Sequence, residues 1–185
     1  NGSNLDFVLV RYNADGTLDT GFGGGDGIVT QAIGTGDDEA YAVALQADGK
    51  ILVAGRTVNA TFFDFAVLRY TADGLLDTTF GGGDGIVITD FGASSNDTVS
   101  AVLVQSDGKI VVGGTSANDF AVARYLSDGT LDTSFSGDGK QTLDIATAND
   151  EGRGLALQTD GKIVQAGTGF VGGVQDFALV RGNAD

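Results

Sequence analysis

Short apolar stretches separated by Asp-Gly turns run along the whole chain. The first stretch, residues 7–12 (FVLVRY), is apolar at successive positions except at Arg11. A strand of this kind is buried on both faces, whereas a half-exposed strand alternates apolar and polar residues. The turn NADG at residues 13–16 follows, and we expect residues 17–22 to return as the partner strand. The pattern predicts a β-hairpin at the start of the chain.

A second hairpin is predicted around another Asp-Gly turn. Residues 40–46 and 51–55 are expected to be strands on either side of the turn ADGK at residues 47–50. If two residues form the turn, Gln46 lies opposite Ile51. The chain shows no sustained helical spacing of apolar residues, so we expect an all-β fold.

Both hairpins recur. The Asp-Phe pairs that open the first hairpin begin at positions 6, 64, 119 and 176, which are 58, 55 and 57 residues apart. The second hairpin occurs three times, as AVALQADGKILVAG, AVLVQSDGKIVVGG and GLALQTDGKIVQAG. A repeat at a fixed period indicates the architecture more directly than any local pattern. We therefore treat residues 1–185 as a single repeat array, with units at residues 6–63, 64–118 and 119–175 and a partial unit at 176–185.

Two hairpins in each unit give about four strands, which is typical of a β-propeller blade. The predicted fold is an all-β propeller of four-stranded antiparallel blades, with three blade repeats and a partial fourth. Burial between neighbouring blades would explain why the strands are apolar on both faces. A parallel β-helix is the rival fold, but its coils are shorter and lack paired Asp-Gly hairpins.

The expected core positions are the repeated Phe and Leu residues, namely Phe7, Phe65, Phe120 and Phe177 with Leu18, Leu76 and Leu131. Propellers typically have 4–8 blades, so three and a part would not close a ring. We expect the ring to be completed by other blades of the same longer polypeptide, about six or seven in all. The alternative partners are other copies of the chain, in a two-chain ring or a head-to-tail assembly.

The composition excludes several kinds of chemistry. The chain has no His, Cys, Met or Trp, which removes thiol chemistry, His-based acid–base catalysis and His/Cys zinc sites. The net charge is -15, and 23 of the 25 acidic residues are Asp, a residue that favours turns and binds hard cations. Without a basic stripe we expect no nucleic acid partner. Without an apolar run of about 18 residues we expect no membrane insertion.

The glycine-rich loops are the candidate metal sites. The sequence GGGDG occurs at residues 23–27 and 81–85 and contains Asp26 and Asp84. A phosphate-binding loop would need a following Lys and a helix, and neither is present. Calcium needs six to eight oxygen ligands, so Asp26 or Asp84 with carbonyl oxygens would need further donors. The two interpretations are a structural turn, which we favour, and a Ca²⁺ site.

Other repeated charged and aromatic residues have structural interpretations. Each repeated Arg, as in Arg69, lies in an apolar strand and needs a carboxylate partner such as Asp77 on the returning segment. The Lys at the hairpin tips, such as Lys50, are expected to be solvated. Tyr70 and its equivalents are expected to pack between blades.

The phrases DFAVLRYTADGLLDTTFGGGDG and AVALQADGKILVAG resemble the delta-60 repeat of bacterial proteins, over residues 6–181. The resemblance implies a β-propeller within a large secreted or surface protein, and it brings no catalytic residues. The chain departs from the repeat at residues 136–139, where the glycine loop is one residue shorter, and at Gly182, where Tyr is expected.

Three functions are open at this point. The favoured one is a non-catalytic structural, adhesive or interaction scaffold of a large extracellular or cell-surface bacterial protein or assembly. The second is a propeller that binds a small ligand or glycan at its axial mouth, through the divergent loops at residues 56–63, 92–96 and 168–175. The third is a glycosidase or lyase that uses two of the many carboxylates.

Overall fold

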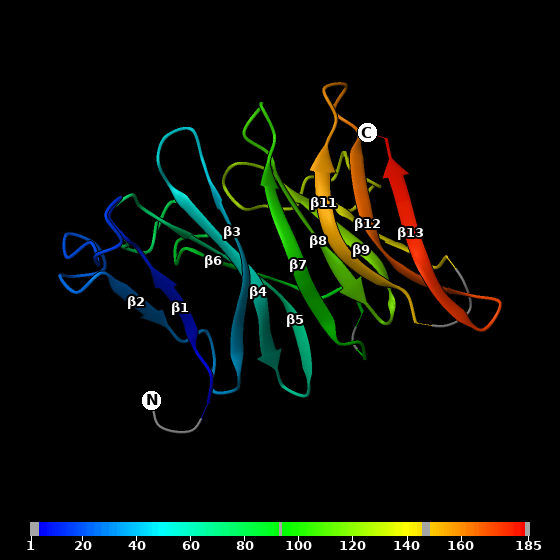
Figure 1. Ribbon diagram of the computed structural model, residues 1–185, viewed down its shortest axis with the longest axis horizontal. Helices are drawn as coiled ribbons and strands as arrows, with labels where there is room; N and C mark the ends of the chain where they lie inside the picture. Colours follow the sequence, from blue (N-terminus) through cyan, green and yellow to red (C-terminus); the bar gives the residue numbers. More distant parts are fainter. Residues whose placement is uncertain (1–3, 93, 146–148, 184–185) are drawn as a thin grey trace.

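The computed structural model describes residues 4–92, 94–145 and 149–183 (Figure 1). This part of the chain consists of β-strands, turns and loops and has no helix. The strands are β1 (Phe7–Val10), β2 (Ile28–Gln31), β3 (Asp38–Leu45), β4 (Ile51–Asn59), β5 (Phe62–Tyr70), β6 (Ile86–Thr89), β7 (Asp97–Val104), β8 (Ile110–Ser116), β9 (Asp119–Tyr125), β10 (Lys140–Leu143), β11 (Glu151–Leu157), β12 (Ile163–Val171) and β13 (Val174–Gly182). No helix able to span a membrane occurs in the described ranges.

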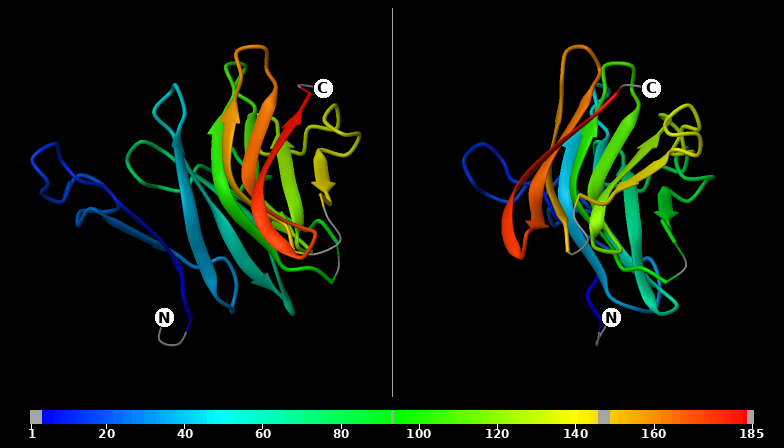
Figure 2. Two further views of the ribbon diagram at one scale, coloured as in Figure 1. Left: turned by 45° about the vertical axis from the view of Figure 1, so that its right-hand side comes forward. Right: turned by 90° about the vertical axis from the view of Figure 1, so that its right-hand side faces the viewer.

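The strands form four antiparallel sheets that correspond to successive blades. The second and third blades are complete, with the strand orders β3-β4-β5-β6 and β7-β8-β9-β10. In the described residues the first blade has β1 and β2, and the fourth has β11, β12 and β13. Figure 2 shows these sheets fanned out side by side in chain order. The predicted all-β propeller fold with four-stranded antiparallel blades is confirmed.

Two details of the hairpins differ from the prediction. Leu45 lies opposite Ile51, and the amide of Gln46 donates to the carbonyl of Lys50, so the turn has three residues. Gly49 allows this turn because it adopts a left-handed conformation, with φ of 84°. The predicted pairing of Gln46 with Ile51 is therefore wrong by one position.

The partner of the first strand also differs from the prediction. β1 pairs with β2, while residues 17–22 contribute only an isolated bridge between Tyr12 and Leu18. The Asp19 carboxylate accepts a hydrogen bond from the Gly21 amide, which turns the backbone away from a strand path.

The expected connecting loop at residues 56–63 is a strand hairpin as well, since β4 and β5 continue to Asn59 and from Phe62. Residues 168–175 likewise belong mostly to β12 and β13.

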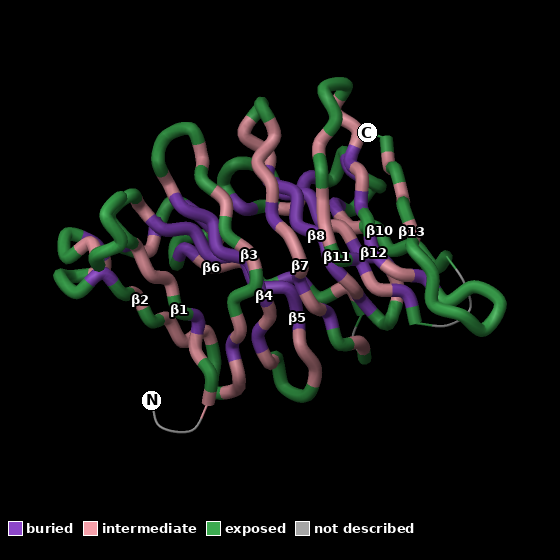
Figure 3. Tube along the Cα trace, in the orientation of Figure 1, coloured by how far each residue is buried: buried purple, intermediate pink, exposed green. Residues whose placement is uncertain are grey.

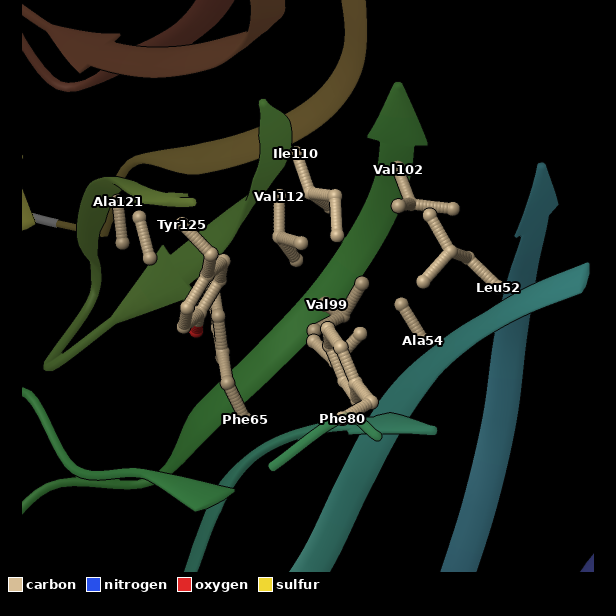
Figure 4. Packing of buried hydrophobic residues seen from close by; sticks show 12 residues of the cluster. Leu52, Ala54, Phe65, Phe80, Val99, Val102, Ile110, Val112, Ala121 and Tyr125 are labelled. Atoms are coloured by element: carbon tan, nitrogen blue, oxygen red, sulfur yellow. The ribbon is translucent and has the colours of Figure 1, made fainter. Parts of the chain in front are cut away.

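The core lies between the blades, as the two-faced apolar strands predict. Buried segments run through the middle of the stack, whereas the hairpin tips are exposed (Figure 3). Between the second and third blades, Leu52, Ala54 and Phe65 meet Val99 and Val102 (Figure 4). Each such residue loses contact with water only because two sheets meet, so the blades stabilise one another.

The predicted core is confirmed for three of the four Phe residues. Phe7, Phe65 and Phe120 are 1%, 0% and 2% exposed. Phe177 is 100% exposed, so its prediction is wrong, because among the described residues no sheet covers that face of β13.

The Leu residues are less buried than the sequence analysis predicts. Leu18 is 40% exposed, and Leu76 and Leu131 are only partly buried at the edges of core clusters. The deeper residues of the same phrase are the Phe residues that end it, Phe22, Phe80 and Phe135, which the sequence analysis missed as core.

Replacement of Phe65 by Ala should lower the free energy of unfolding by about 3–5 kcal/mol, because it leaves a cavity between two blades. Leu75→Ala is the control, since Leu75 is 63% exposed in a turn and should change stability by less than about 0.5 kcal/mol. Chemical denaturation of both variants measures the difference. Equal midpoints for Phe65→Ala and the unaltered protein would contradict this packing.

Candidate functional site

A buried charge cluster recurs in the complete blades. Arg69 of β5 donates from Nε to Oδ2 of Asp77 at 2.8 Å, and Nζ of Lys50 lies 3.0 Å from the same oxygen. The third blade repeats this arrangement with Arg124, Asp132 and Lys109, at 2.8 and 3.0 Å. The carboxylate partner expected for each Arg is therefore present. The expectation of solvated Lys side chains is wrong for Lys50 and Lys109, which reach back from the hairpin tip to this carboxylate.

The same Arg side chains join each blade to the next. Nη1 of Arg69 donates to the carbonyl oxygen of Ser127 in the third blade, and its guanidinium lies 4.5 Å from the ring centre of Phe80. Arg11 does the same from the first blade, with Ala72 and Phe22 as partners. An Arg can bind a carboxylate, a carbonyl and an aromatic face at once because its guanidinium is planar and has five N–H donors. The cluster is thus a structural lock between blades.

These contacts perturb the acidic member of each cluster. Burial alone would raise the pKa of Asp77, but hydrogen bonds from Thr79 and Lys50 and the charge of Arg69 hold that pKa well below its usual range. Burial acts on Asp132 in the same way, and Ser134, Lys109 and Arg124 outweigh it. A carboxylate with a depressed pKa is charged at neutral pH and is unsuited to donating a proton.

The glycine-rich loops also connect neighbouring blades. The amide of Gly81 donates to the carbonyl of Asp128 in the next blade at 3.0 Å, and Gly23 donates to Asp73 at 3.1 Å. A Cβ on Gly81 would lie 2.1 Å from the carbonyl oxygen of Ile86, so the loop has no room for a side chain there. These contacts account for Gly23 and Gly81 by structure alone.

The two predicted metal ligands lie apart from other carboxylates. Asp26 and Asp84 are exposed, and each accepts a hydrogen bond at 3.0 Å from the amide two residues later, of Ile28 or Ile86. Neither belongs to the carboxylate groups that the described part of the chain brings together. A calcium site built on them stays a prediction from the sequence.

The structure does bring other carboxylates together, at two junctions between blades. Oxygens of Asp64, Asp90 and Asp97 lie within 4.8 Å of one another. The next junction repeats this group with Asp119, Asp144 and Asp150. Three carboxylates supply oxygen donors of the type that Ca²⁺ prefers, although they provide only part of the six to eight that it requires. In each group the first Asp lies 25 or 26 positions before the second, and the third follows 6 or 7 positions later, so no single local motif marks all three.

Each group holds a carboxyl that is difficult to ionise. Burial and the charges of Asp90 and Asp97 raise the pKa of Asp64 and outweigh a hydrogen bond from Asn59 that lowers it. Burial together with Asp144 and Asp150 raises the pKa of Asp119. In the first repeat Ala32 takes the place of Asp90, so the third acid of the group is missing there.

A polar pocket of about 500 Å³ lies along the innermost strands of the blades. β3, β7 and β11 run side by side along one side of the molecule (Figure 1). They present Tyr41, Ser100 and Arg153 at equivalent positions of the pocket wall, and Asn96, Asn118 and Glu151 also line it. Hydroxyl, amide and charged groups around an aromatic ring could bind a polar ligand such as a sugar.

The charges around this pocket are paired. Glu39 accepts a hydrogen bond from Arg56 at 2.8 Å and another from the Tyr41 hydroxyl, and Glu151 pairs with Arg153. The hydrogen bond from Tyr41 is the main cause of the lowered pKa of Glu39; burial opposes it and Arg56 reinforces it. The sequence analysis missed these residues. The sequence does distinguish them, because Tyr41, Ser100 and Arg153 occupy equivalent positions of three repeats. The residue type changes at this position, whereas it is constant at most others.

The fold and the repeated locks define a class of protein, the β-propeller built from sequence repeats. The model of the "Domain of unknown function (DUF5122) beta-propeller" family matches residues 1–22, 46–80, 105–135 and 158–185, which together make up well over half of the chain. The chain belongs to this β-propeller family. No curated protein matches it.

Replacement of Asp77 by Asn should reduce the free energy of unfolding at pH 7 by about 3–5 kcal/mol, because it leaves Arg69 buried without its carboxylate. The control is Asp19→Asn, which acts on the equivalent pair with side chains 36% and 28% exposed, where solvent screening should make the loss smaller. Urea denaturation at pH 7 compares the two. A smaller loss for Asp77→Asn than for Asp19→Asn would be inconsistent with a buried lock.

The raised pKa of Asp64 has a defined effect on stability. Its stabilising contribution is complete below the unfolded pKa of about 3.9 and is lost as the pH rises through the higher folded pKa. Asp90→Asn removes one repelling charge and should therefore increase stability at pH 7 by about 0.2–1 kcal/mol. The gain should shrink as the pH is lowered towards 4, because the raised pKa of Asp64 favours its uncharged form over that range.

Asp84→Asn is the matched control for this measurement. Asp84, like Asp90, is exposed and accepts a backbone amide hydrogen bond two residues later, but it lies outside the carboxylate group. Thermal unfolding at pH 4 and pH 7 in low salt should show no pH-dependent gain for this variant. The same gain in both variants would indicate a general effect of net charge.

Proposed function

We propose that this propeller is a non-catalytic scaffold in a large extracellular or cell-surface bacterial protein or assembly. The proposal rests on the repeated cluster of Arg, Asp and Lys. In each cluster the charged side chains bind one another, and the Arg joins its blade to the next. The resemblance of the repeat to the delta-60 repeat supports the proposed location, and the proposed structural or adhesive role rests on the repeats, the acidity and the absence of His and Cys.

The distribution of acidic groups also favours a scaffold over an enzyme. A carboxylate glycosidase needs an accessible pair of acids, one of which carries a proton near neutral pH. In the two carboxylate groups, Asp97 is 0% exposed and accepts a hydrogen bond from the Phe91 amide, and Asp150 is 0% exposed and accepts one from Ile145. A sugar substrate has no access to the oxygens of Asp97 and Asp150, so neither group offers three accessible acids.

The second candidate function is ligand or glycan binding at the pocket on the innermost strands. Tyr41, Ser100 and Arg153 favour it, because structurally equivalent positions with different chemistry create an asymmetric surface. In this case Arg153 and Tyr41 would bind the ligand, since both are exposed on the pocket wall.

An immobilised glycan panel, combined with an assay for newly released reducing ends, tests these functions together. The scaffold proposal expects neither release of reducing ends nor retention on the panel. Retention that is lost on Arg153→Ala but kept in Arg181→Ala, an exposed Arg outside this pocket, would favour the ligand-binding function. Release of reducing ends would overturn the non-catalytic proposal. Fractionation of source cells should place the full-length protein outside the cytoplasm.

A further inference from the structure

The innermost strands of three successive blades carry a β-bulge at the same position. In β3 the register shifts by one residue between Ala40 and Ala42, so Tyr41 is the extra residue. Ser100 of β7 and Arg153 of β11 are the extra residues of the equivalent bulges. A bulge directs a side chain away from the regular path of a strand and is frequent beside functional sites. The residues at the three bulges are also the ones that differ between repeats on the pocket wall.

Most basic residues of the chain occupy repeated positions, and two of the exceptions lie at this pocket. The repeated Arg and Lys make up seven of the ten, namely Arg11, Arg69, Arg124, Arg181, Lys50, Lys109 and Lys162. Of the other three, Lys140 donates to the carbonyl of Asp90. Arg153 lies in the pocket wall, and Arg56 donates from Nη1 to Oγ1 of Thr98, another wall residue, at 3.3 Å. In a chain with a net charge of -15, these two arginines make the pocket the surface best suited to an anion.

The uncharged side chains of the wall have hydrogen-bond donors to spare. Thr98 uses its oxygen as the acceptor for the arginine, and Thr115 accepts from the amide of Gly152 at 3.1 Å. Oδ1 of Asn96 accepts from the amide of Phe63, also at 3.1 Å. Within the described chain, none of these three side chains donates its own hydrogen to a protein acceptor. A ligand in the pocket therefore meets hydroxyl and amide donors, and it must itself supply acceptors.

Arg153 supplies further donors at one side of the pocket. Its Nη2 donates to Glu151, and the two side chains are 68% and 41% exposed. An ion pair this exposed is weak, and a guanidinium has five N–H groups, so a second carboxylate can bind beside Glu151. On the other side of β7, the ring of Tyr41 is 45% exposed. Such a ring packs well against the apolar face of a sugar.

We propose that this pocket binds a sugar that carries one carboxylate, a uronic acid. The carboxylate binds Arg153, the oxygens of the sugar accept from Thr98, Thr115 and Asn96, and its apolar face packs on Tyr41. The inference rests on ligand binding at this pocket, which is the second candidate function, and names the class of ligand. The walls come from three successive blades of the described chain.

The acidic surroundings limit the ligand to a single negative charge. The two arginines are matched by Glu39 and Glu151, with which they form ion pairs. Asp97 opens β7, and Asp150 directly precedes β11. A polyanion would bring further charges against this surface and would be repelled. The volume of about 500 Å³ lies within the usual range of ligand pockets and accommodates a monosaccharide.

A matched pair of sugars tests the role of the carboxylate. Methyl β-glucuronide and methyl β-glucoside differ only in having a carboxylate or a hydroxymethyl group on the ring. Ligand-observed NMR titrations with the full chain should show the glucuronide binding about 10–100-fold more tightly, because charge-assisted hydrogen bonds to an Arg are lost with the glucoside. Sodium acetate, which has the carboxylate without the sugar, should bind more weakly than the glucuronide.

Two pairs of variants test the residues. Arg153→Gln should reduce the affinity for the glucuronide to that for the glucoside, whereas Arg181→Gln, outside the pocket, should not change it. Asn96→Asp keeps the acceptor for the Phe63 amide and replaces the free donor by a charged oxygen, so it should weaken glucuronide binding at least about tenfold. Asn13→Asp adds the same charge away from the pocket and should have no effect. Circular dichroism checks the fold of each variant, since all four residues are exposed.

The outcomes separate this inference from the functions on which it depends. Equal affinities for the two sugars, or an unchanged glucuronide affinity in Arg153→Gln or Asn96→Asp, would overturn the uronic acid while ligand binding at the pocket stands. Acetate that binds as tightly as the glucuronide would overturn the sugar. No binding of any of the three probes would overturn the inference and the ligand-binding function together, and the scaffold function would remain.

Discussion

The contact on which the stack depends is the buried Arg that joins a blade to its neighbour. In the second blade, Arg69 binds the carboxylate of Asp77 within its own sheet and the carbonyl of Ser127 in the next sheet. A guanidinium in an apolar interface is tolerated only when its N–H groups have partners, so the alignment of two blades is tied to one side chain. Lys50 adds a second positive charge to the same carboxylate. Neighbouring sheets therefore slide or rotate only if a buried charge loses a partner.

Apolar burial supplies the larger share of the attraction between blades. The strands of the inner blades are covered on both faces, as the cluster around Phe65 and Val99 shows. Burial of apolar surface is non-directional, whereas the Arg lock and the glycine loops are directional. Burial between neighbouring units is typical of repeat proteins, in which each unit contributes a face that only its neighbour can cover.

The two carboxylate groups at the junctions between blades oppose this packing. Asp64 and Asp119 are each close to two other carboxylates, and burial already disfavours their charged forms. The chain thus combines carboxylates whose pKa is held low by cationic partners with carboxylates whose pKa is raised by acidic neighbours. At neutral pH the first kind stabilises the fold and the second kind opposes it, so net charge alone does not describe how pH acts on this protein.

The sequence by itself determined the repeat, the fold class and the partner of each buried Arg. It did so because the Asp-Phe and Asp-Gly-Lys phrases recur at a nearly constant period, and because a charged residue in a two-faced apolar strand requires a counterion. The tertiary structure alone decided which loops and carboxylates meet. Asp64 and Asp97 are distant in sequence, and Tyr41 and Arg153 face one pocket only because three innermost strands run side by side. It also decided that Phe177 is exposed while Phe65 is buried, since burial depends on the neighbouring sheet and not on the residue's own strand.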